Sequence, residues 1–329
     1  MRLLITGDIG FIGFHLAQIA LKAGYTVDGV DNHNDYYDVT LKEARHNELT
    51  QYPGYTHYKL NLVDIETLPD QSYDAIINLA AQAGVRYSLD HPHADSESNI
   101  NGFLHVLEYA RRVKPKHFIY ASSSSVYGLN QKSPFSVDDE INHPASLYAA
   151  TKRANELMAH AYSHLYELPT TGLRFFTVYG PYGRPDMASF IFTKHIIEGK
   201  PIQVFNEGDM IRDFTYIDDI VSGIMQLIPK APKPKALGIK PNESNTPYAV
   251  YNLGNNHPVK LLDYIQELER LIGKKAIMDK RPMQMGDVYK TYADIDASKN
   301  DFGYDPKTSY QEGLKRFVEW YKTFYNVQP

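Results

Sequence analysis

The sequence predicts an α/β protein in which a doubly wound parallel sheet is followed by a smaller C-terminal α/β domain. In the first half of the chain, short apolar runs alternate with helical patterns, as in successive β-α-β units on a parallel sheet. A glycine-rich turn follows the first apolar run, and after about Gly180 the elements become shorter and more irregular. We therefore expect a first domain at residues 1–180 and a second, substrate-binding domain at 181–329, a division that leaves room for later segments to return to the first sheet.

The apolar runs are expected to be buried strands, and the amphipathic segments between them helices. Strands are predicted at residues 3–6, 26–30, 75–80, 117–122 and 170–176. Helices are predicted at residues 11–23, 97–112 and 147–166 in the first domain, and at 189–198, 217–227, 259–272 and 309–325 in the second. Residues 229–247, rich in Pro, Lys and Asn, are expected to form an exposed loop.

The composition argues against several classes of protein and site. A net charge of -5 argues against nucleic acid as the main partner, since phosphate binding usually requires a basic patch. With no cysteine, the chain has no disulfide and no cysteine-ligated metal, which suits a reducing cytoplasm. The apolar N-terminal run is interrupted by glycines and Asp8 and is too short to span a membrane. The densest histidine cluster, at residues 91–93, has no evident third ligand, so we expect no metal site.

Gly7, Gly10 and Gly13 lie between a predicted strand and a predicted helix, the arrangement of a Rossmann-type dinucleotide-binding turn. Glycines at these places permit a tight turn, close approach of a pyrophosphate to the backbone, and close packing of the helix on the strand. The helix N-terminus then presents free N–H groups and the positive end of its dipole to the phosphates. The turn therefore predicts a dinucleotide cofactor.

The next predicted strand leads into Asp31, roughly 20 residues beyond the glycines, where an acid accepts hydrogen bonds from the adenosine ribose hydroxyls. A carboxylate there repels a 2′-phosphate, so the sequence predicts NAD rather than NADP, with Asn32 and Asn34 as additional contacts. Asp8 lies inside the glycine turn, where a carboxylate facing a pyrophosphate is unfavourable. We expect its side chain to point away from the cofactor or to cap the helix.

Tyr148 and Lys152 are four residues apart on a predicted helix, so their side chains share one face. An ammonium beside a phenol favours the phenolate and lowers the tyrosine pKa from about 10 toward the working pH. The tyrosine is then a base that removes the proton of a hydroxyl group while hydride leaves the same carbon. Ser123, with Ser124 and Ser125 as neighbours, follows the preceding strand, at the edge where open parallel sheets bind their ligands.

Five further segments carry a resemblance that runs along nearly the whole chain. They are AAQAGVRYS (80–88), SSSSVYG (122–128), SLYAATK (146–152), GPYGRPDMA (180–188) and RDFTYIDDI (212–220). With the glycine turn, they occur in the order found in the extended short-chain dehydrogenase/reductase family, and within it the chain is most similar to the UDP-glucuronate 4-epimerases. The stretch GRPDMA best separates an enzyme for a uronate from one for a neutral hexose.

The resemblance implies NAD-dependent 4-epimerisation of UDP-glucuronate to UDP-galacturonate through a 4-keto intermediate. Tyr148 takes the proton of the 4-hydroxyl while the C4 hydride passes to NAD. The 4-keto sugar then swings about its diphosphate link and receives the hydride on its other face. Because NAD is regenerated in every cycle, it is expected to stay tightly bound. A homodimer joined through the helices at 97–112 and 147–166 is implied in the same way.

The resemblance also implies roles for particular residues, among them Lys152 as a ligand of the nicotinamide ribose and Phe176 as a neighbour of the nicotinamide. The expected cofactor-binding residues are Gly7, Gly10, Phe11, Ile12, Gly13, Asp31, Asn32, Asn34, Asn61, Leu62, Leu79, Ala80, Ala81, Gln82, Asn99, Tyr148, Lys152 and Phe176. The expected substrate-binding residues are Arg86, Ser88, Ser123, Thr177 and Arg184 for the sugar and its carboxylate, and Arg212, Gln284 and Asp287 for the UDP part.

Other reactions stay open at this point. In 4,6-dehydratases and uronate decarboxylases the strand-end motif commonly contains an acid, whereas residues 123–125 are all serine, which favours return of the hydride without elimination. A 4-epimerase of UDP-N-acetylhexosamine or UDP-galactose fits the same motifs. A regulatory NAD-binding protein without catalysis would not need Tyr148 and Lys152. For a uronate, the 4-keto form is a β-keto acid that can lose carbon dioxide, and we expect Thr177 to hold the carboxylate so that this does not occur.

Overall fold

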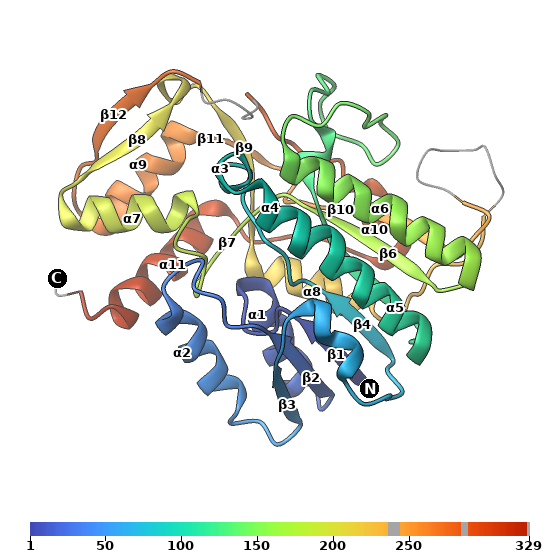
Figure 1. Ribbon diagram of the computed structural model, residues 1–329. Coiled ribbons are helices and arrows are strands. Elements are labelled where there is room, and N and C mark those ends of the chain that lie inside the picture. Colours follow the sequence, from blue (N-terminus) through green and yellow to red (C-terminus); the bar gives the residue numbers. More distant parts are fainter. Residues whose placement is uncertain (236–243, 284–288, 328–329) are drawn as a thin grey trace.

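The computed structural model describes residues 1–235, 244–283 and 289–327. Its main layer is a seven-stranded sheet in which all neighbours are parallel, in the order β3-β2-β1-β4-β5-β6-β10 (Figure 1). The strand order reverses between β1 and β4, the switch point at which doubly wound folds bind ligands. The predicted Rossmann-type α/β fold is confirmed. The strands are β1 (Arg2–Thr6), β2 (Thr26–Asp31), β3 (Tyr55–Lys59), β4 (Ala75–Asn78), β5 (Phe118–Ser123), β6 (Thr170–Phe175) and β10 (Tyr248–Leu253).

Helices cover both faces of this sheet. On one face α5 and α6 lie side by side, and on the other α1 packs against α8 (Figure 1). Because successive side chains of a strand point to opposite faces, Leu3 belongs to one apolar core and Leu4 to the other. The helices of this part are α1 (Phe11–Lys22), α2 (Val39–Leu49), α3 (Tyr87–Asp90), α4 (Pro92–Asp95), α5 (Phe103–Val113), α6 (Leu147–Tyr166), α8 (Ile217–Leu227) and α10 (Asp296–Phe302).

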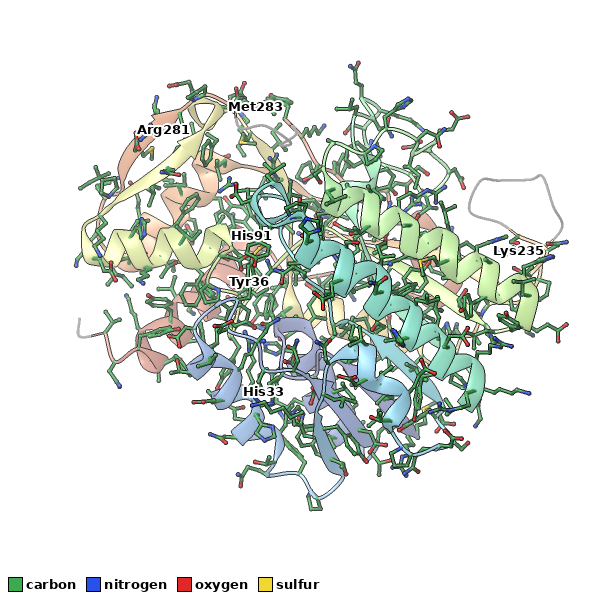
Figure 2. All side chains as sticks on the ribbon, in the orientation of Figure 1. His33, Tyr36, His91, Lys235, Arg281 and Met283 are labelled. Carbon is green, nitrogen blue, oxygen red and sulfur yellow. The ribbon has the colours of Figure 1, made fainter. Side chains whose placement is uncertain are left out.

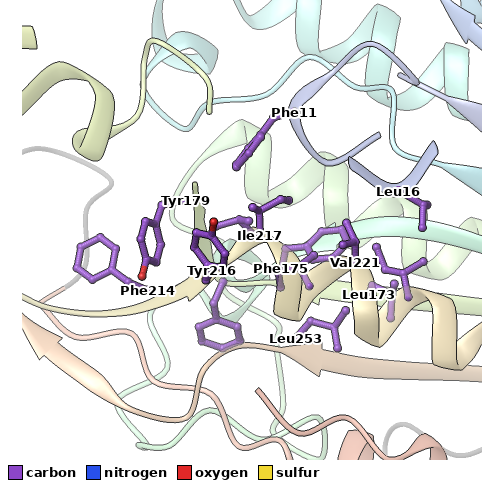
Figure 3. Close-up of a cluster of buried hydrophobic side chains, with 14 of the residues drawn as sticks. Phe11, Leu16, Leu173, Phe175, Tyr179, Phe214, Tyr216, Ile217, Val221 and Leu253 are labelled. Carbon is purple, nitrogen blue, oxygen red and sulfur yellow. The ribbon is translucent and has the colours of Figure 1, made fainter. Parts of the chain in front are cut away.

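The smaller part is built on a three-stranded sheet, β11-β9-β7, and a parallel pair, β12-β8. Its core continues that of the main sheet: Figure 3 shows Phe11 of α1 and Leu253 of β10 in one apolar cluster with Tyr179, Tyr216 and Ile217. The two parts therefore share one continuous apolar core. The elements of the smaller part are β7 (Thr177–Tyr179), α7 (Ala188–Glu198), β8 (Pro201–Phe205), β9 (Ile211–Tyr216), β11 (Pro258–Lys260), α9 (Leu261–Ile272), β12 (Ile277–Arg281) and α11 (Tyr310–Phe324).

Two predicted helices, α6 and α8, have the bounds expected from the sequence. For α6 the reason is local. The backbone N–H of Ala149 donates to the hydroxyl of Ser146 at 3.2 Å, so that Ser146 caps the helix and sets its first turn. This cap places Tyr148 and Lys152 on the face that looks toward the end of β5.

Other elements differ from the expectation. Residues 96–102 form a π-helical turn before α5 begins, and residues 258–260 pair with β9 as β11 and do not start a helix. Strand β3 was not predicted, because its residues are half exposed and polar at the sheet edge. Strand β10 follows the predicted domain boundary but pairs with β6, so the chain returns to the first sheet.

In the predicted loop, residues 229–235 and 244–247 form neither helix nor strand, and residues 236–243 lie outside the described part. Among the described residues, none of the helices has the length and apolar content that crossing a bilayer requires.

Candidate functional site

A cavity of about 410 Å³ lies at the carboxyl ends of the parallel strands, beside the switch point. It extends from Asp31, at the end of β2, to Thr177 and Arg184 of the smaller part, so both parts of the molecule form its wall. Most of the predicted site is brought together there. The predicted residues at the wall are Gly7, Gly10, Phe11, Ile12, Gly13, Asp31, Asn32, Asn34, Asn61, Leu62, Leu79, Ala80, Ala81, Gln82, Ser123, Ser124, Ser125, Tyr148, Lys152, Phe176, Thr177 and Arg184.

The glycine turn has no room for a side chain at any of its three glycines. Gly7 has a φ of +71°, and a Cβ there would lie 2.8 Å from the backbone nitrogen of Ala80. A Cβ on Gly13 would lie 2.0 Å from the carbonyl oxygen of Gly7. The N–H of Gly10 donates to that same carbonyl at 2.9 Å and closes the turn. Because α1 begins at Phe11, its first free N–H groups lie at the cavity wall, and the turn fits the diphosphate of a dinucleotide.

At the other end of the cavity, the carboxylate of Asp31 is held in one orientation. Its Oδ1 accepts a hydrogen bond from the backbone N–H of His33 at 2.8 Å and lies 3.5 Å from the ammonium of Lys42. Lys42 also donates to the side-chain oxygen of Asn34 at 2.8 Å. A fixed carboxylate at the end of β2 fits the hydroxyl groups of an adenosine ribose.

Asp8 points away from the cavity, one of the two arrangements expected for it, and Gly10 is the N-cap of α1. The Asp8 carboxylate is fully buried beneath β2, where Oδ2 accepts hydrogen bonds from the Tyr55 hydroxyl and, at 2.8 Å, from Nδ1 of His57. The Asp8 carboxylate is therefore turned away from the place of the phosphates.

Within the described ranges, no group of three or more His, Cys, Asp and Glu side chains could hold a metal ion.

Tyr148 and Lys152 share one face of α6, as predicted. Nζ of Lys152 lies 5.9 Å from the centroid of the Tyr148 ring and donates to the carbonyl oxygen of Ala121 at 3.0 Å. Burial lowers the pKa of Lys152 to about 8. The tyrosine differs from the expectation, because burial raises the pKa of Tyr148 above its ordinary value. The groups that lower it are Arg184 and a hydrogen bond with Ser123, whereas the ammonium of Lys152 is directed at Ala121.

Asn99 lies behind the wall of the cavity. It is buried, and it exchanges two hydrogen bonds of 2.9 Å with the backbone of Gln82, from the Gln82 N–H to Oδ1 and from Nδ2 to the Gln82 carbonyl. These two hydrogen bonds hold the segment after β4 in place.

At the end of β5, the backbone N–H of Ser125 donates to the Ser123 hydroxyl at 3.2 Å and begins a 3₁₀ turn, Ser124–Tyr127, that presents the serines to the cavity.

A polar contact joins the two parts of the molecule at the cavity wall. Tyr36, in the loop after β2, donates to Oδ2 of Asp186 at 3.1 Å, and Asp186 forms an ion pair with Arg184. Tyr36 also lies edge-on to Tyr87, whose ring is 4.3 Å from that of His91. Tyr36 and His91 are labelled near the centre of Figure 2. Because Tyr36 and Arg184 both line the cavity, this contact connects its cofactor end with the segment expected to bind the sugar.

Two of the residues predicted to bind the sugar do not line the cavity. Arg86 is exposed, and its guanidinium lies 4.7 Å from the ring centroid of Phe205 at the end of β8. Ser88 is buried and donates to the carbonyl oxygen of Val85 at 2.7 Å. Thr177 and Arg184 are thus the predicted residues of the smaller part that reach the cavity.

Of the three residues predicted for the UDP part, the structure describes Arg212. Arg212 donates to the carbonyl oxygen of Tyr289 at 3.1 Å and does not line the cavity. Gln284 and Asp287 lie outside the described residues. The role of these three residues stays a prediction.

Other residues of the wall were not predicted. Most of them adjoin predicted residues, so the strand-end pattern would have found them. Lys42 had no such signal, because its approach to Asp31 depends on how α2 packs beside β2. The additional wall residues are Val30, Tyr36, Tyr37, Lys42, Leu60, Ala83, Gly84, Val85, Ser98, Ala121, Ser122, Phe175, Val178 and Met187.

Comparisons with known proteins agree with this geometry. The sequence matches the NAD dependent epimerase/dehydratase family over residues 3–240. It is 50% identical to Protein CapI of Staphylococcus aureus, with 99% of each chain covered. It is 46% identical to a probable UDP-glucuronate 4-epimerase of Rhizobium meliloti, covering 99% of this chain and 98% of that relative. Among solved structures, the UDP-glucuronic acid 4-epimerase of Bacillus cereus in complex with UDP-glucuronic acid and NAD has a TM-score of 0.89 at 33% identity, covering 99% of this chain and 100% of that chain. The chain belongs to the NAD-dependent epimerase/dehydratase family.

Proposed function

We propose that this enzyme interconverts UDP-glucuronate and UDP-galacturonate by NAD-dependent epimerisation at C4. The observation that carries the proposal is the composition of the cavity wall near Tyr148, which combines the serines at 123–125 with Thr177 and Arg184 from the smaller part. Hydroxyls and a guanidinium suit a sugar carboxylate, and the three serines offer no acid for elimination chemistry. The similarity to UDP-glucuronate 4-epimerases over almost the whole chain supports the same substrate.

In this reaction Tyr148 is the base. NAD, when bound against the glycine turn, supplies reversible acceptance of hydride from C4 of the sugar. Tyr148 takes the proton of the 4-hydroxyl as the carbonyl forms, and returns it when the 4-keto sugar is reduced on its other face. Ser123 hydrogen-bonds the same oxygen, and Ser123 and Arg184 favour the phenolate over the phenol. The positive charge of Lys152, 5.9 Å from the centroid of the Tyr148 ring, is expected to act in the same direction.

The proposal is tested by incubating the purified protein with UDP-glucuronate, without added NAD, and following the products by NMR. Appearance of UDP-galacturonate would establish both the reaction and a retained cofactor. A UDP-pentose would make the enzyme a decarboxylase. Turnover of UDP-galactose or of a UDP-N-acetylhexosamine in place of the uronate would show that the sugar was misassigned. Bound dinucleotide without turnover of any of these would indicate a regulatory protein.

Thr177→Val is expected to increase the decarboxylated fraction of the product by roughly tenfold or more. The 4-keto uronate loses carbon dioxide when the bond to its carboxylate aligns with the ketone π system. A hydrogen bond from Thr177 to the carboxylate opposes this alignment, and hydrogen bonds to charged groups contribute about 1.5–3 kcal/mol. Valine keeps the shape of the side chain and removes the hydroxyl. The ratio of UDP-pentose to epimer is measured by NMR.

A matched control removes a hydroxyl elsewhere. Thr193 of α7 is buried, and its hydroxyl has no hydrogen-bond partner within the part of the chain that the structure describes. Thr193→Val is expected to leave the product ratio unchanged. An unchanged ratio in Thr177→Val as well would mean that Thr177 does not control the carboxylate.

We further propose that the enzyme is a homodimer joined through α5 and α6. These neighbouring helices expose Leu104, Leu157 and Leu165 by 40%, 57% and 64%, and burial of such apolar surface drives association. The double variant Leu157→Arg, Leu165→Arg is expected to sediment as a monomer, with wild type and Leu262→Arg as dimers. A monomeric wild type would contradict the proposal.

We also place the enzyme in the cytoplasm, in keeping with a chain that contains no cysteine.

A further inference from the structure

Asp95, at the end of α4, is a fully buried carboxylate behind the catalytic wall of the cavity. Its Oδ1 accepts a hydrogen bond from Nδ2 of Asn99 at 3.0 Å. Its Oδ2 has no hydrogen-bond partner within the part of the chain that the structure describes. A buried carboxylate that is only half satisfied is costly, so a position of this kind calls for a compensating interaction.

The first effect of Asp95 is on Asn99. The amide nitrogen of Asn99 lies within hydrogen-bond distance of three acceptors: Asp95, the Gln82 carbonyl at 2.9 Å and the Thr151 hydroxyl at 3.2 Å. It has only two hydrogens to share among them. Thr151 directly precedes Lys152 on α6, and Gln82 lines the cavity. Asp95 therefore sits at the junction of the cofactor wall and the catalytic helix.

The second effect of Asp95 is electrostatic. Lys152 is only 3% exposed, and its ammonium donates to the carbonyl of Ala121. Burial lowers the pKa of Lys152 to about 8, and the negative charge of Asp95 acts in the opposite direction. Burial likewise raises the pKa of Asp95 to about 6, and Lys152 opposes that rise. Between these two values both groups are charged, and each stabilises the charge of the other.

Other charged groups near this pair act on Tyr148. From the loop after β7, Arg184 lowers the pKa of Tyr148 and Asp186 raises it, and Asp95 raises it as well. α4 packs against α6 and against the π-helical turn at residues 96–102. Within the described residues, the charged group that acts on Lys152 is Asp95.

We propose that Asp95 is a positioning residue of the reaction, a buried counter-ion that keeps the Lys152 ammonium charged while it holds Asn99 against the catalytic helix. The proposal rests on the proposed function in one respect: epimerisation through a Tyr148 phenolate requires a charged Lys152. The electrostatic part can be tested without any sugar substrate.

The deciding measurement is the titration of Lys152 in the NAD-loaded protein labelled with ¹³C at lysine Cε. Loss of one resonance in Lys152→Arg assigns the signal. Asp95→Asn keeps the shape and an acceptor for Asn99 but removes the charge. We expect the titration midpoint of Lys152 to fall by roughly one unit, a tenfold loss of proton affinity. Asp95→Ser must lower it too, whereas Asp95→Glu, which keeps the charge, restores it. An unchanged midpoint in Asp95→Asn would overturn the proposal.

The loss of the Asp95 charge is also expected to change the pH dependence of turnover, in one direction only. Because the ammonium is lost as pH rises through the pKa of Lys152, the alkaline limb of kcat/KM for UDP-glucuronate moves to lower pH in Asp95→Asn. The matched control is Asp28→Asn, a buried carboxylate paired with Arg2 at 2.8 Å and absent from the cavity wall; it is expected to keep the wild-type pH profile. Loss of activity by the same factor at every pH would show a merely structural role. A wild type that turns over no UDP-glucuronate would refute the proposed function, and the Lys152 midpoint would still decide the role of Asp95.

Discussion

Replacement of Tyr148 by phenylalanine is expected to lower kcat for epimerisation by roughly 10²- to 10⁴-fold, with NAD still bound, because it removes the acid–base group. The change removes the phenol oxygen and leaves the ring in the cavity wall. No other phenol in the described part of the chain lies four residues before a buried lysine on the same helix. The glycine turn and Asp31, at the other end of the cavity, are untouched, so cofactor retention is expected to be unchanged. Initial rates are followed by NMR, and NAD per chain is measured after denaturation.

The control for this variant is Tyr52→Phe. Tyr52 follows α2 and is not part of the cavity wall, so the loss of its hydroxyl is expected to leave kcat unchanged. If Tyr148→Phe kept more than roughly a tenth of the wild-type turnover, the proton would have to be taken by another group. Loss of NAD together with turnover would instead mean that the phenol is needed to retain the cofactor.

The other large effect is expected in stability, at Glu156, one turn beyond Lys152 on α6. Its carboxylate is buried and receives two hydrogen bonds from the guanidinium of Arg174 in β6, at 2.9 and 3.0 Å. The Ser122 hydroxyl at the end of β5 donates to the same carboxylate at 2.7 Å. The side chain of Arg174 is only 4% exposed. Glu156 therefore joins α6 to β6 through the ion pair with Arg174, and to β5 through the hydrogen bond from Ser122.

Glu156→Gln is expected to lower the free energy of unfolding by about 3–5 kcal/mol, because it leaves the charge of Arg174 buried without its counter-ion. Burial by itself would raise the pKa of Glu156, but Arg174, Ser122 and Arg153 together more than offset this, and the pKa lies below its ordinary value. A carboxyl group of this kind stabilises the fold above its ordinary pKa and loses that contribution as pH falls through the folded-state value. The difference in free energy of unfolding between the variant and the wild type is therefore expected to be largest at neutral pH and to become smaller in acid. Urea unfolding at several pH values measures it.

An exposed ion pair provides the comparison. Glu312 and Arg316 are 2.8 Å apart on α11, with side chains 46% and 48% exposed, and Glu312→Gln is expected to cost less than about 1 kcal/mol. If Glu156→Gln and Glu312→Gln lowered the free energy of unfolding equally, the buried ion pair would contribute no more to stability than a surface pair.

Much of the catalytic helix and of the cofactor turn followed from the sequence, because both depend on neighbours in the chain. The cap at Ser146 and the four-residue spacing of Tyr148 and Lys152 are local features, and α6 has the predicted bounds. Gly7 and Gly13 occupy positions where a side chain would collide with the backbone. The pKa of Tyr148 was predicted wrongly: burial raises it, and the groups that lower it are Arg184 and Ser123 in place of the expected Lys152. Burial depends on everything packed around the ring.

The sequence by itself thus determined the fold class, the cofactor turn and the position of Tyr148 and Lys152 on one face of α6, since short-range spacing and hydrophobic periodicity encode all three. Only the tertiary structure decided that β10 pairs with β6, that Tyr36 donates to Asp186 at the cavity wall, and that Asp95 lies beside α6. Parallel strands and buried charges bring together residues that are far apart in the chain. No rule of local spacing relates such partners, because their contact depends on which helix packs on which face of the sheet and on how much water that packing excludes.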